Sequence, residues 1–419
     1  MSKRNVLFGA VGLGVALAGV GFMGCEVSVN SDGAGGSPDT TSGGSSASSG
    51  GSTDPSSGGS TSPSSGGSTG AASGGASNNS SFIACTNTTP PPPPAEGTPK
   101  GPCDIYADDG GPCVAAHSTV RALYGGYNGP LYQVKKTSDG TTKDIMPLTA
   151  GGIANAADQD TFCGTNACTI SIIYDQSGNA NHLTVAPAGG AKTTPDVEAN
   201  AKSMPITLAG GKKAYGVHVV PGVGYRNNKA CNTAVGDNAQ TVYMVVGGKN
   251  YNGACCFDYG NMERNSHDNG EGTMEAVYFG TCTIWGKGAG SGPWIMGDLE
   301  NGLWAGNISP YEGNTPVTYD FITGMVKGDA PGKNHWTIKV GNAQTGPLTT
   351  PFDGQRPSAR YNPMRKEGAI GLGTGGDNSA GAKGDWFEGM MTTHYASSTA
   401  DDAVQANIVS VYGSAAYVQ

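Results

Sequence analysis

The feature that most constrains this chain is a long series of short β-prone segments, separated by turn residues, from residue 101 onward. The sequence holds 70 glycines, many of them between runs rich in valine, isoleucine, threonine and aromatic residues. Many short strands joined by glycine-rich turns favour an all-β, jelly-roll-like sandwich of the concanavalin kind. The strands are expected at 169–174, 241–246, 274–279, 294–304, 319–326, 336–340, 369–372 and 386–392.

Two segments favour helices instead, at 113–123 and 401–412. The second places Val404, Ile408 and Val411 on one stripe and has Thr399 as a candidate N-cap. We expect both helices to be peripheral to the sandwich.

The N-terminus has the pattern of an export signal. Lys3 and Arg4 precede an apolar run that ends before Gly24-Cys25, so residues 1–24 are predicted to be a signal peptide. A small residue before a cysteine is also typical of bacterial lipoproteins, which predicts a lipid on Cys25. Ordinary cleavage with release, or retention as an anchor, are the alternatives. All three outcomes, lipidation, release and anchoring, place the protein outside the cytoplasm or on the cell surface. Membrane contact is expected only through the N-terminus.

Residues 25–98 are dominated by serine, glycine, threonine and proline, with little apolar surface to offset the entropy of ordering. We predict a disordered tether, stiffened at 90–94 by five prolines. Residues 99–419 then form one folded domain.

Charge and motifs exclude several classes of function. The net charge of −9 argues against a nucleic-acid partner and against a polyanionic substrate, and favours a neutral ligand. The sequence contains no P-loop, dinucleotide fingerprint, GxSxG elbow or HExxH helix, and no cysteine spacing that matches a zinc site. We therefore expect no cofactor and no metal. We also expect the protein to be a monomer.

Ten cysteines in an exported chain predict a disulfide framework. Cys103 with Cys113, and Cys163 with Cys168, would close short loops, which leaves Cys231 and Cys282 for each other. Cys85, in the tether, is then the odd one. The adjacent Cys255 and Cys256 either reach separate distant partners or bond to each other in a tight ring.

The stretch 293–304 is the most informative for chemistry. Strand alternation puts Asp298 and Glu300 on one face with Trp294, Met296 and Trp304. Acids among aromatic residues suit a sugar cleft, in which rings stack on sugars and carboxylates do acid/base work. An ordinary half-exposed strand with solvated acids is the alternative.

Glycoside hydrolysis usually takes a second carboxyl group. Asp377 lies in Gly375-Gly376-Asp377-Asn378, where glycines would let the backbone approach a ligand closely. The same residues are also ordinary turn chemistry, and pattern alone does not select Asp377 from the 33 acids.

Several motifs resemble the catalytic domain of glycoside hydrolase family 54, the α-L-arabinofuranosidases of the fungal B type. The likeness runs from about residue 101 to 412. Its motifs are Gly101-Pro-Cys-Asp-Ile-Tyr, Pro112-Cys-Val-Ala-Ala-His-Ser-Thr, Leu148-Thr-Ala-Gly-Gly-Ile-Ala, Ile173-Tyr-Asp-Gln-Ser-Gly-Asn, Gly224-Tyr-Arg-Asn-Asn, Ala254-Cys-Cys-Phe-Asp-Tyr-Gly-Asn, Gly292-Pro-Trp-Ile-Met and Tyr361-Asn-Pro-Met.

The resemblance implies a retaining, exo-acting enzyme that releases terminal arabinofuranose from plant arabinan or arabinoxylan. By motif, Glu300 falls on the family's nucleophile and Asp377 on its acid/base. Cys255 and Cys256 fall on a vicinal disulfide that packs against the sugar ring, and the two short pairs also match family disulfides. The positions that fall on the family's other sugar contacts are Trp285, Asp298, Asn301 and Gly376.

The sequence departs from the family pattern in three places. Gly302 stands where relatives usually carry a second asparagine, so one polar sugar contact is expected to be missing. Cys231 and Cys282 look additional. The arabinose-binding β-trefoil module of the relatives has no counterpart here, and we expect it to be absent.

Two other functions fit the same residues. A β-D-xylosidase could use the same cleft, and a comparison of aryl arabinofuranoside with aryl xyloside hydrolysis separates the two. A non-catalytic lectin for arabinosyl side chains would bind without releasing arabinose.

Overall fold

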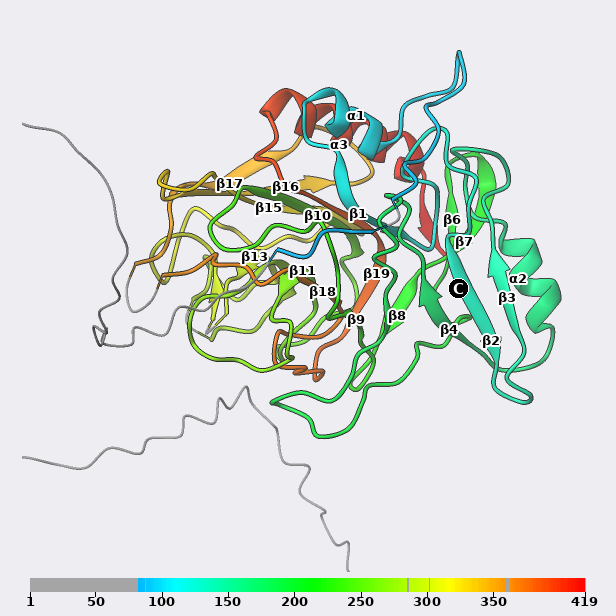
Figure 1. Ribbon diagram of the computed structural model, residues 1–419, viewed down its shortest axis with the longest axis horizontal. Coiled ribbons are helices and arrows are strands. Elements are labelled where there is room, and N and C mark those ends of the chain that lie inside the picture. The colour runs from blue at the N-terminus through cyan, green and yellow to red at the C-terminus, as the bar shows by residue number, and fades with distance from the viewer. Residues whose placement is uncertain (1–81, 87, 285, 301, 359–361, 419) are drawn as a thin grey trace, which may run out of the picture. The chain divides into compact units, whose positions relative to one another are not determined.

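The computed structural model describes residues 82–418, apart from 87, 285, 301 and 359–361. In this part of the chain, two seven-stranded and two three-stranded antiparallel sheets account for the strands. The upper layer in Figure 1 contains β15, β16 and β17, and the layer beneath it contains β11, β13 and β18. Among the described helices, none is both long and apolar enough to span a membrane.

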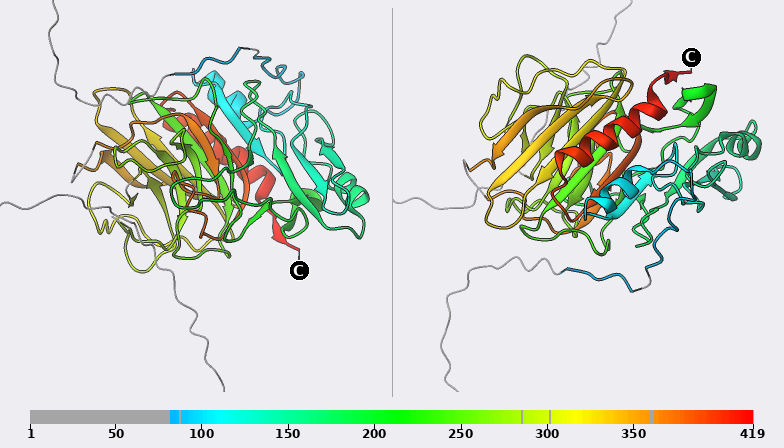
Figure 2. Two further views of the ribbon diagram at one scale, coloured as in Figure 1. Left: turned by 60° about the horizontal axis from the view of Figure 1, so that its bottom comes forward. Right: turned by 90° about the horizontal axis from the view of Figure 1, so that it is seen from above.

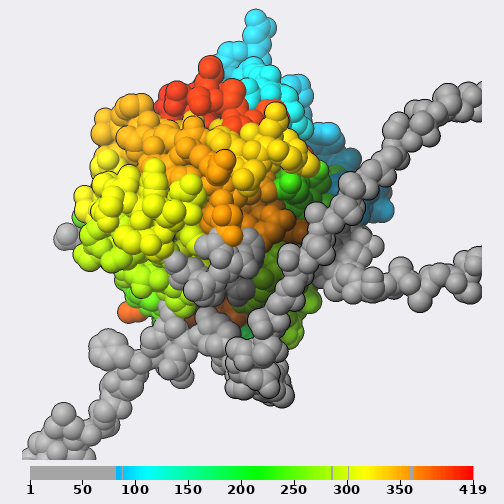
Figure 3. All heavy atoms as spheres, turned by 90° about the vertical axis from the view of Figure 1, so that its left-hand side faces the viewer, coloured from blue at the N-terminus to red at the C-terminus, as the bar shows by residue number. Residues whose placement is uncertain are grey.

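The first large sheet has the order β1-β19-β10-β15-β16-β17, with β8 also paired to β19. Figure 3 shows segments from distant parts of the sequence side by side on one face, where the red chain near residue 400 lies beside the cyan chain near residue 100. The strands of this sheet are β1 (Cys113–Ser118), β8 (Val217–Val219), β10 (Gln240–Gly247), β15 (Phe321–Gly328), β16 (His335–Asn342), β17 (Thr349–Gln355) and β19 (Gly384–Thr392).

The second large sheet has the order β14-β13-β12-β11-β18-β9-β5. It carries the candidate site residues at the ends of its strands. The strands are β5 (Thr184–Val185), β9 (Tyr225–Asn227), β11 (Asp258–Met262), β12 (Glu275–Gly280), β13 (Trp294–Asp298), β14 (Leu303–Trp304) and β18 (Ala369–Leu372).

The main core lies between these two sheets. Val242 and Trp386 of the first sheet belong to one buried cluster with Val277, Ile295 and Leu372 of the second. Burying such side chains contributes roughly 1.5–3 kcal/mol each. The all-β sandwich predicted from the sequence is therefore confirmed.

A second core covers the outer face of the first sheet. Val404 and Ile408 of α3 (Ser398–Tyr412) are buried against residues such as Val245 and Met390. Figure 2 shows α3, in red, lying across these strands. Because this sheet is covered on both faces, all eight residues of β10 are buried. The predicted helix is confirmed, but its N-cap is Ser397, whose side chain accepts a hydrogen bond from the Ala400 N–H at 3.1 Å.

Smaller elements complete the domain. The two three-stranded sheets have the orders β3-β2-β4 and β20-β6-β7. Their strands and the remaining helices are β2 (Tyr132–Lys136), β3 (Thr142–Ile145), β4 (Cys168–Ile173), β6 (Pro205–Leu208), β7 (Lys212–Tyr215), β20 (Ala416–Tyr417), α1 (Pro102–Asp108), α2 (Ala156–Cys163) and the 3₁₀ turn at Ala209–Gly211.

The helix expected at 113–123 is wrong. Its first six residues form β1, which pairs antiparallel with β19 from Cys113 opposite Thr392 to Ser118 opposite Glu388. Every residue of β1 is buried. Burial on both faces and pairing at the sheet edge outweigh the helix propensity of Ala115 and Ala116.

The single strand expected at 294–304 is also wrong, because the chain reverses direction within it. Asp298 of β13 lies opposite Leu303 of β14. Glu300 has φ of 61° and Gly302 has φ of 139°, so the turn uses backbone conformations that favour glycine. This gives a conformational reason for Gly302.

The end of the predicted tether lies against the domain, which corrects the boundary drawn at residue 98. Cys85 forms a disulfide with Cys231, and the Asn232 N–H donates to the Ile83 carbonyl at 2.7 Å. The Thr89 N–H donates to the Gly178 carbonyl at 3.1 Å. Residues 1–81, with the predicted signal peptide and Cys25, lie outside the described residues.

The disulfide framework differs from the prediction at one pair. Cys103–Cys113 and Cys163–Cys168 are formed, and Cys255 bonds to Cys256. The predicted Cys231–Cys282 bond is wrong because Cys85 occupies Cys231. Cys282 is buried in a different cluster, with Cys256 and Trp294.

Candidate active site

The candidate site is built around the turn that joins β13 to β14. The Glu300 N–H donates to Asp298 Oδ1 at 3.1 Å, so the two predicted neighbours are in direct contact. They contact each other through a turn, not along a strand. Glu300 is only 2 % exposed and Asp298 only 5 % exposed.

Four hydrogen bonds fix the carboxylate of Glu300. Its Oε1 accepts from the backbone N–H groups of Asn269 at 2.8 Å and Gly270 at 3.1 Å. Its Oε2 accepts from the Thr273 N–H at 2.7 Å and from the Thr273 hydroxyl at 2.9 Å. Both oxygens are therefore held by the loop before β12. A carboxylate with a fixed orientation is what nucleophilic attack on a sugar requires.

Further carboxyl groups surround this pair. Burial raises the pKa of Asp298 to about 7, and the nearby charges of Asp377 and Glu300 add to the shift. Asp258, at the start of β11, is fully buried, and burial followed by the charge of Asp298 raises its pKa well above the usual range. Burial, a hydrogen bond to Glu300 and the Glu300 charge raise the pKa of Asp268 to about 7. Asp298 and Asp268 therefore titrate near neutral pH, well above an ordinary carboxyl group.

Asp377 lies on the loop that follows β18 and is half-buried. Its Oδ1 accepts from the Ser379 N–H at 2.9 Å, and its carbonyl accepts from the Ala191 N–H at 2.9 Å. A Cβ on Gly190 would lie 3.6 Å from the Asp377 Cβ and 3.5 Å from the His267 ring. Asp377 thus lies against the loop that contains Gly190 and Ala191.

The Cys255–Cys256 disulfide lies close to both Asp298 and the Asp377 loop. The Cys256 N–H donates to the Ser379 carbonyl at 3.2 Å, which ties the disulfide to the Asp377 loop. The two sulfur atoms and an Asp298 oxygen lie within 4.8 Å of one another. Because both sulfurs are bonded to each other, this set offers no thiolate to a metal. It offers a compact apolar surface beside carboxyl groups.

The aromatic residues expected to stack on sugar do not do so. Trp294 is 1 % exposed and Trp304 is 4 % exposed, and each packs in a hydrophobic cluster. Trp285 and Asn301, implied as sugar contacts, lie outside the described residues. The structure brings Glu300, Asp298, Gly376 and the Cys255–Cys256 disulfide together with Asp377.

Sequence reasoning missed the residues that support these groups: Asp258, Glu263, Asp268, Thr273 and Arg226. Asp258 stands within the quoted double-cysteine motif, and Arg226 within Gly224-Tyr-Arg-Asn-Asn. Those motifs are the sequence signal that could have found these two residues, whereas Glu263, Asp268 and Thr273 lie in none of the quoted motifs.

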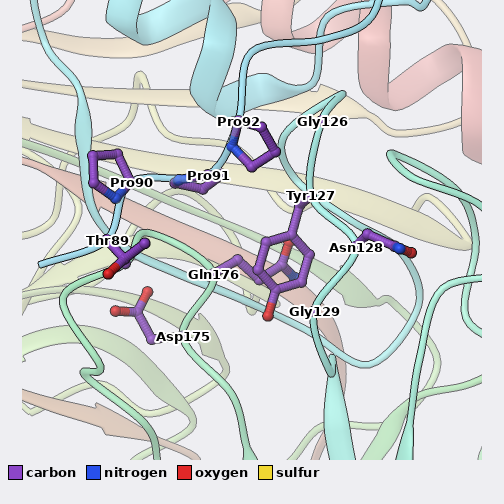
Figure 4. A pocket seen from close by; sticks show the side chains of 11 residues that line it. Thr89, Pro90, Pro91, Pro92, Gly126, Tyr127, Asn128, Gly129, Asp175 and Gln176 are labelled. Atoms are coloured by element: carbon purple, nitrogen blue, oxygen red, sulfur yellow. The ribbon is translucent and has the colours of Figure 1, made fainter.

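A separate pocket is lined by residues that lie outside the strands of the two large sheets. Figure 4 shows it between the proline segment and the neighbouring loops, lined by Pro90, Pro91, Tyr127 and Gln176. It shares no lining residue with the site around Glu300.

Known proteins share this sequence and fold. The family model for the catalytic domain of α-L-arabinofuranosidase B matches residues 102–414. A probable α-L-arabinofuranosidase B of Aspergillus clavatus is 58% identical over 314 residues, which cover 74% of this chain and 61% of the relative. The α-L-arabinofuranosidase of Hypocrea jecorina is 56% identical over 315 residues, covering 74% and 62%.

Solved structures of arabinofuranosidases are similar to this chain in both fold and sequence. An arabinofuranosidase complexed with arabinofuranosyl-α-1,2-xylobiose superposes with a TM-score of 0.73 at 52% identity, covering 76% of this chain and 66% of that one. A family 54 α-L-arabinofuranosidase soaked with a cyclic sulfate inhibitor gives 0.72 at the same identity and coverage.

These likenesses place the domain in the class of glycoside hydrolase catalytic domains. Within that class, the chain belongs to the α-L-arabinofuranosidase B catalytic family, glycoside hydrolase family 54. The chain spans about 61% of the length of the Aspergillus clavatus relative.

Proposed function

We propose that this chain is a retaining, exo-acting α-L-arabinofuranosidase that removes terminal arabinofuranose from arabinan or arabinoxylan side chains. The observation that carries the proposal is the carboxylate of Glu300, fixed by four hydrogen bonds beside the Cys255–Cys256 disulfide and the Asp377 loop. The family match and the solved complex with an arabinofuranosyl xylobiose support it.

Glu300 is the nucleophile in this proposal. One of its oxygens attacks the anomeric carbon of the sugar as the bond to the leaving oxygen breaks, giving a covalent arabinosyl ester. The four donors on Glu300 hold the attacking group in one orientation, which reduces the entropy lost on reaching the transition state.

Asp377 is the acid/base. In the first step its proton passes to the leaving oxygen, and in the second it takes a proton from the water that attacks the anomeric carbon. The ester bond to Glu300 then breaks and arabinose leaves with its original configuration. Its half-buried position suits contact with both a leaving group and water.

The sharpest test of the first role is Glu300→Gln. We expect turnover of an aryl α-L-arabinofuranoside to fall by at least about 10⁴-fold while the far-ultraviolet spectrum and melting temperature stay close to those of the wild type. The control is Glu96→Gln, an exposed acid near the start of the described chain, which should keep wild-type rate. A Glu300→Gln enzyme with normal rate contradicts the assignment.

The second role is tested by leaving-group dependence. Asp377→Asn should lose far more rate on an alkyl or sugar arabinofuranoside than on a dinitrophenyl arabinofuranoside, because the latter leaves without protonation. Equal losses on both substrates would exclude Asp377 as the acid.

A second specificity is suggested by one comparison. An arabinofuranosidase/β-xylosidase of Trichoderma koningii is 56% identical to this chain over 315 residues. We therefore include β-D-xylosidase activity in the same cleft as the alternative. Parallel assays of aryl arabinofuranoside and aryl β-xylopyranoside give the ratio of the two activities.

We further propose that the protein works outside the cytoplasm, anchored through a lipid on Cys25 and acting as a monomer on cell-wall polysaccharide. The signal pattern and the net charge of −9 support this proposal. Mass spectrometry of the mature N-terminus and sedimentation of the purified domain test the two parts. An unmodified start elsewhere would exclude the lipid, and a stable dimer would exclude the monomer.

A further inference from the structure

Glu263, which directly follows β11, is a buried acid to which neither family likeness nor the proposed mechanism assigns a role. Its side chain is fully buried. Within the described residues, neither of its carboxyl oxygens has a hydrogen-bond partner. An ionised carboxylate without a donor in such a place is costly, so this group requires an explanation.

The carboxyl group lies directly behind Gly376. A Cβ built on Gly376 would be 1.8 Å from Glu263 Oε2 and 2.5 Å from Glu263 Cδ. Gly376 does not have a positive φ, so its backbone conformation alone does not demand glycine. The Glu263 carboxyl group, together with the Met274 sulfur at 2.5 Å, occupies the space that any side chain would need. Gly376 directly precedes Asp377.

Arg226 of β9 fastens the two segments together. Its Nη1 donates to the Gly375 carbonyl at 2.9 Å, and its Nη2 donates to the carbonyl of Glu263. Arg226 is only 2 % exposed. Because both bonds go to backbone oxygens, they fix the distance between the end of β11 and the Asp377 loop without neutralising the Glu263 carboxyl group directly.

The charges around Glu263 come from three elements. Glu300 and Asp298 lie on the β13–β14 turn, Asp258 lies on β11, and the guanidinium of Arg226 comes from β9. Burial first, and then the charge of Glu300, raise the pKa of Glu263 well above its usual range. The charge of Arg226 acts in the opposite direction and is a smaller effect than burial and Glu300.

We propose that Glu263 is a positioning residue, whose buried carboxyl group supports Gly376 and so holds Asp377 in place. This inference rests on the proposed function of the site. It gives Gly376 a packing role in addition to any contact with sugar.

A double-mutant cycle tests the contact. Gly376→Ala should clash with Glu263, which lowers the melting temperature and reduces kcat by at least about 100-fold. Glu263→Ala alone should reduce kcat about 10-fold. In the double variant the added methyl group enters the space left by the carboxyl group, where its remaining close neighbour is the flexible side chain of Met274. We expect its kcat to exceed that of Gly376→Ala by at least about tenfold, with a higher melting temperature. Additive losses would overturn the proposal.

Glu263→Gln, which keeps the shape and cannot ionise, tests whether the supporting role needs a charge. We expect kcat within about threefold of the wild type and a rate that persists to higher pH, because no charge can develop behind Gly376. Loss of more than about 100-fold in a folded Glu263→Gln enzyme would mean that an anion is needed and would overturn the proposal.

Leaving-group dependence separates positioning from general damage. If Glu263 acts through Asp377, Glu263→Ala should lose more kcat/KM on alkyl than on dinitrophenyl arabinofuranosides, with KM little changed. Equal losses on both would indicate a structural role only. If the wild type releases no arabinose, the proposed function fails, but the melting temperatures of the cycle still report on the contact.

Discussion

The Cys85–Cys231 disulfide allows a worked prediction of stability. It joins residues 146 positions apart. In the chain-entropy model, closing a loop of that length in the unfolded state stabilises the fold by about 5 kcal/mol. The Cys103–Cys113 and Cys163–Cys168 bonds lie inside this loop and shorten it by 10 and 5 positions, which hardly changes a logarithmic dependence. Cys85→Ser should therefore lower the free energy of unfolding by up to about 5 kcal/mol.

For a domain of about 320 residues, that loss corresponds to a fall of about 7 °C in melting temperature. Differential scanning calorimetry of Cys85→Ser and wild type measures it, and peptide mapping without reduction identifies the bonded pair. Cys282→Ala is the control, since it should keep the Cys85–Cys231 peptide. Finding Cys231 joined to Cys282, or no change in melting temperature for Cys85→Ser, would refute the reasoning.

Three further predictions concern single side chains. Thr273→Val removes the hydroxyl donor from Glu300 but keeps the backbone donor, so kcat/KM on an aryl arabinofuranoside should fall about tenfold; an unchanged value would show that this hydrogen bond does not matter. The pKa of Asp298 is about 7, so the folded state holds a proton that the unfolded state releases above about pH 4, and this contribution to stability is lost as pH rises from about 4 to 7. Denaturant unfolding should therefore show a flatter decline over that range for Asp298→Asn than for wild type, and equal slopes would contradict the shifted pKa. Ser397→Ala removes the N-cap of α3 and should cost about 1 kcal/mol in the same assay, whereas Thr399→Ala should cost less.

Strands with a strong local pattern could be predicted from the sequence. The run Thr-Val-Tyr-Met-Val-Val lies within β10, and the Val404 and Ile408 stripe lies on α3. These two segments could be predicted because their intrinsic propensity, their hydrophobic periodicity and their burial all favour the same secondary structure.

Segments whose structure depends on distant partners could not be predicted. The alanine-containing β1 is a strand because β19 pairs with it, more than 260 positions away in the sequence. Cys85 can form a disulfide with Cys231 only because the chain after residue 82 lies along the domain. The turn at Glu300 had a local signal, since Asn301-Gly302 is a strong hairpin dipeptide, and the alternation of 294–304 concealed it.

Some residues of the site could also be predicted from local sequence, and others depend on distant partners. Asp298 and Glu300 are neighbours in sequence, so their proximity followed from local reasoning, although a turn creates it. Asp258 and Glu263 reach the site through the pairing of β11 with β12 and β18, which no local pattern reveals among the 33 acids. Asp377 was named by family resemblance, and the loop contacts of Gly376 and Cys256 now place it beside the others.

Azide rescue tests the central claim most directly. Glu300→Ala, assayed with an activated aryl α-L-arabinofuranoside and sodium azide, should regain rate and release β-L-arabinofuranosyl azide, because azide attacks once from the vacated side. Asp377→Ala should release the α-azide, since two displacements still occur through Glu300. A β-azide from Asp377→Ala, or an α-azide from Glu300→Ala, would contradict the roles proposed for the two carboxylates.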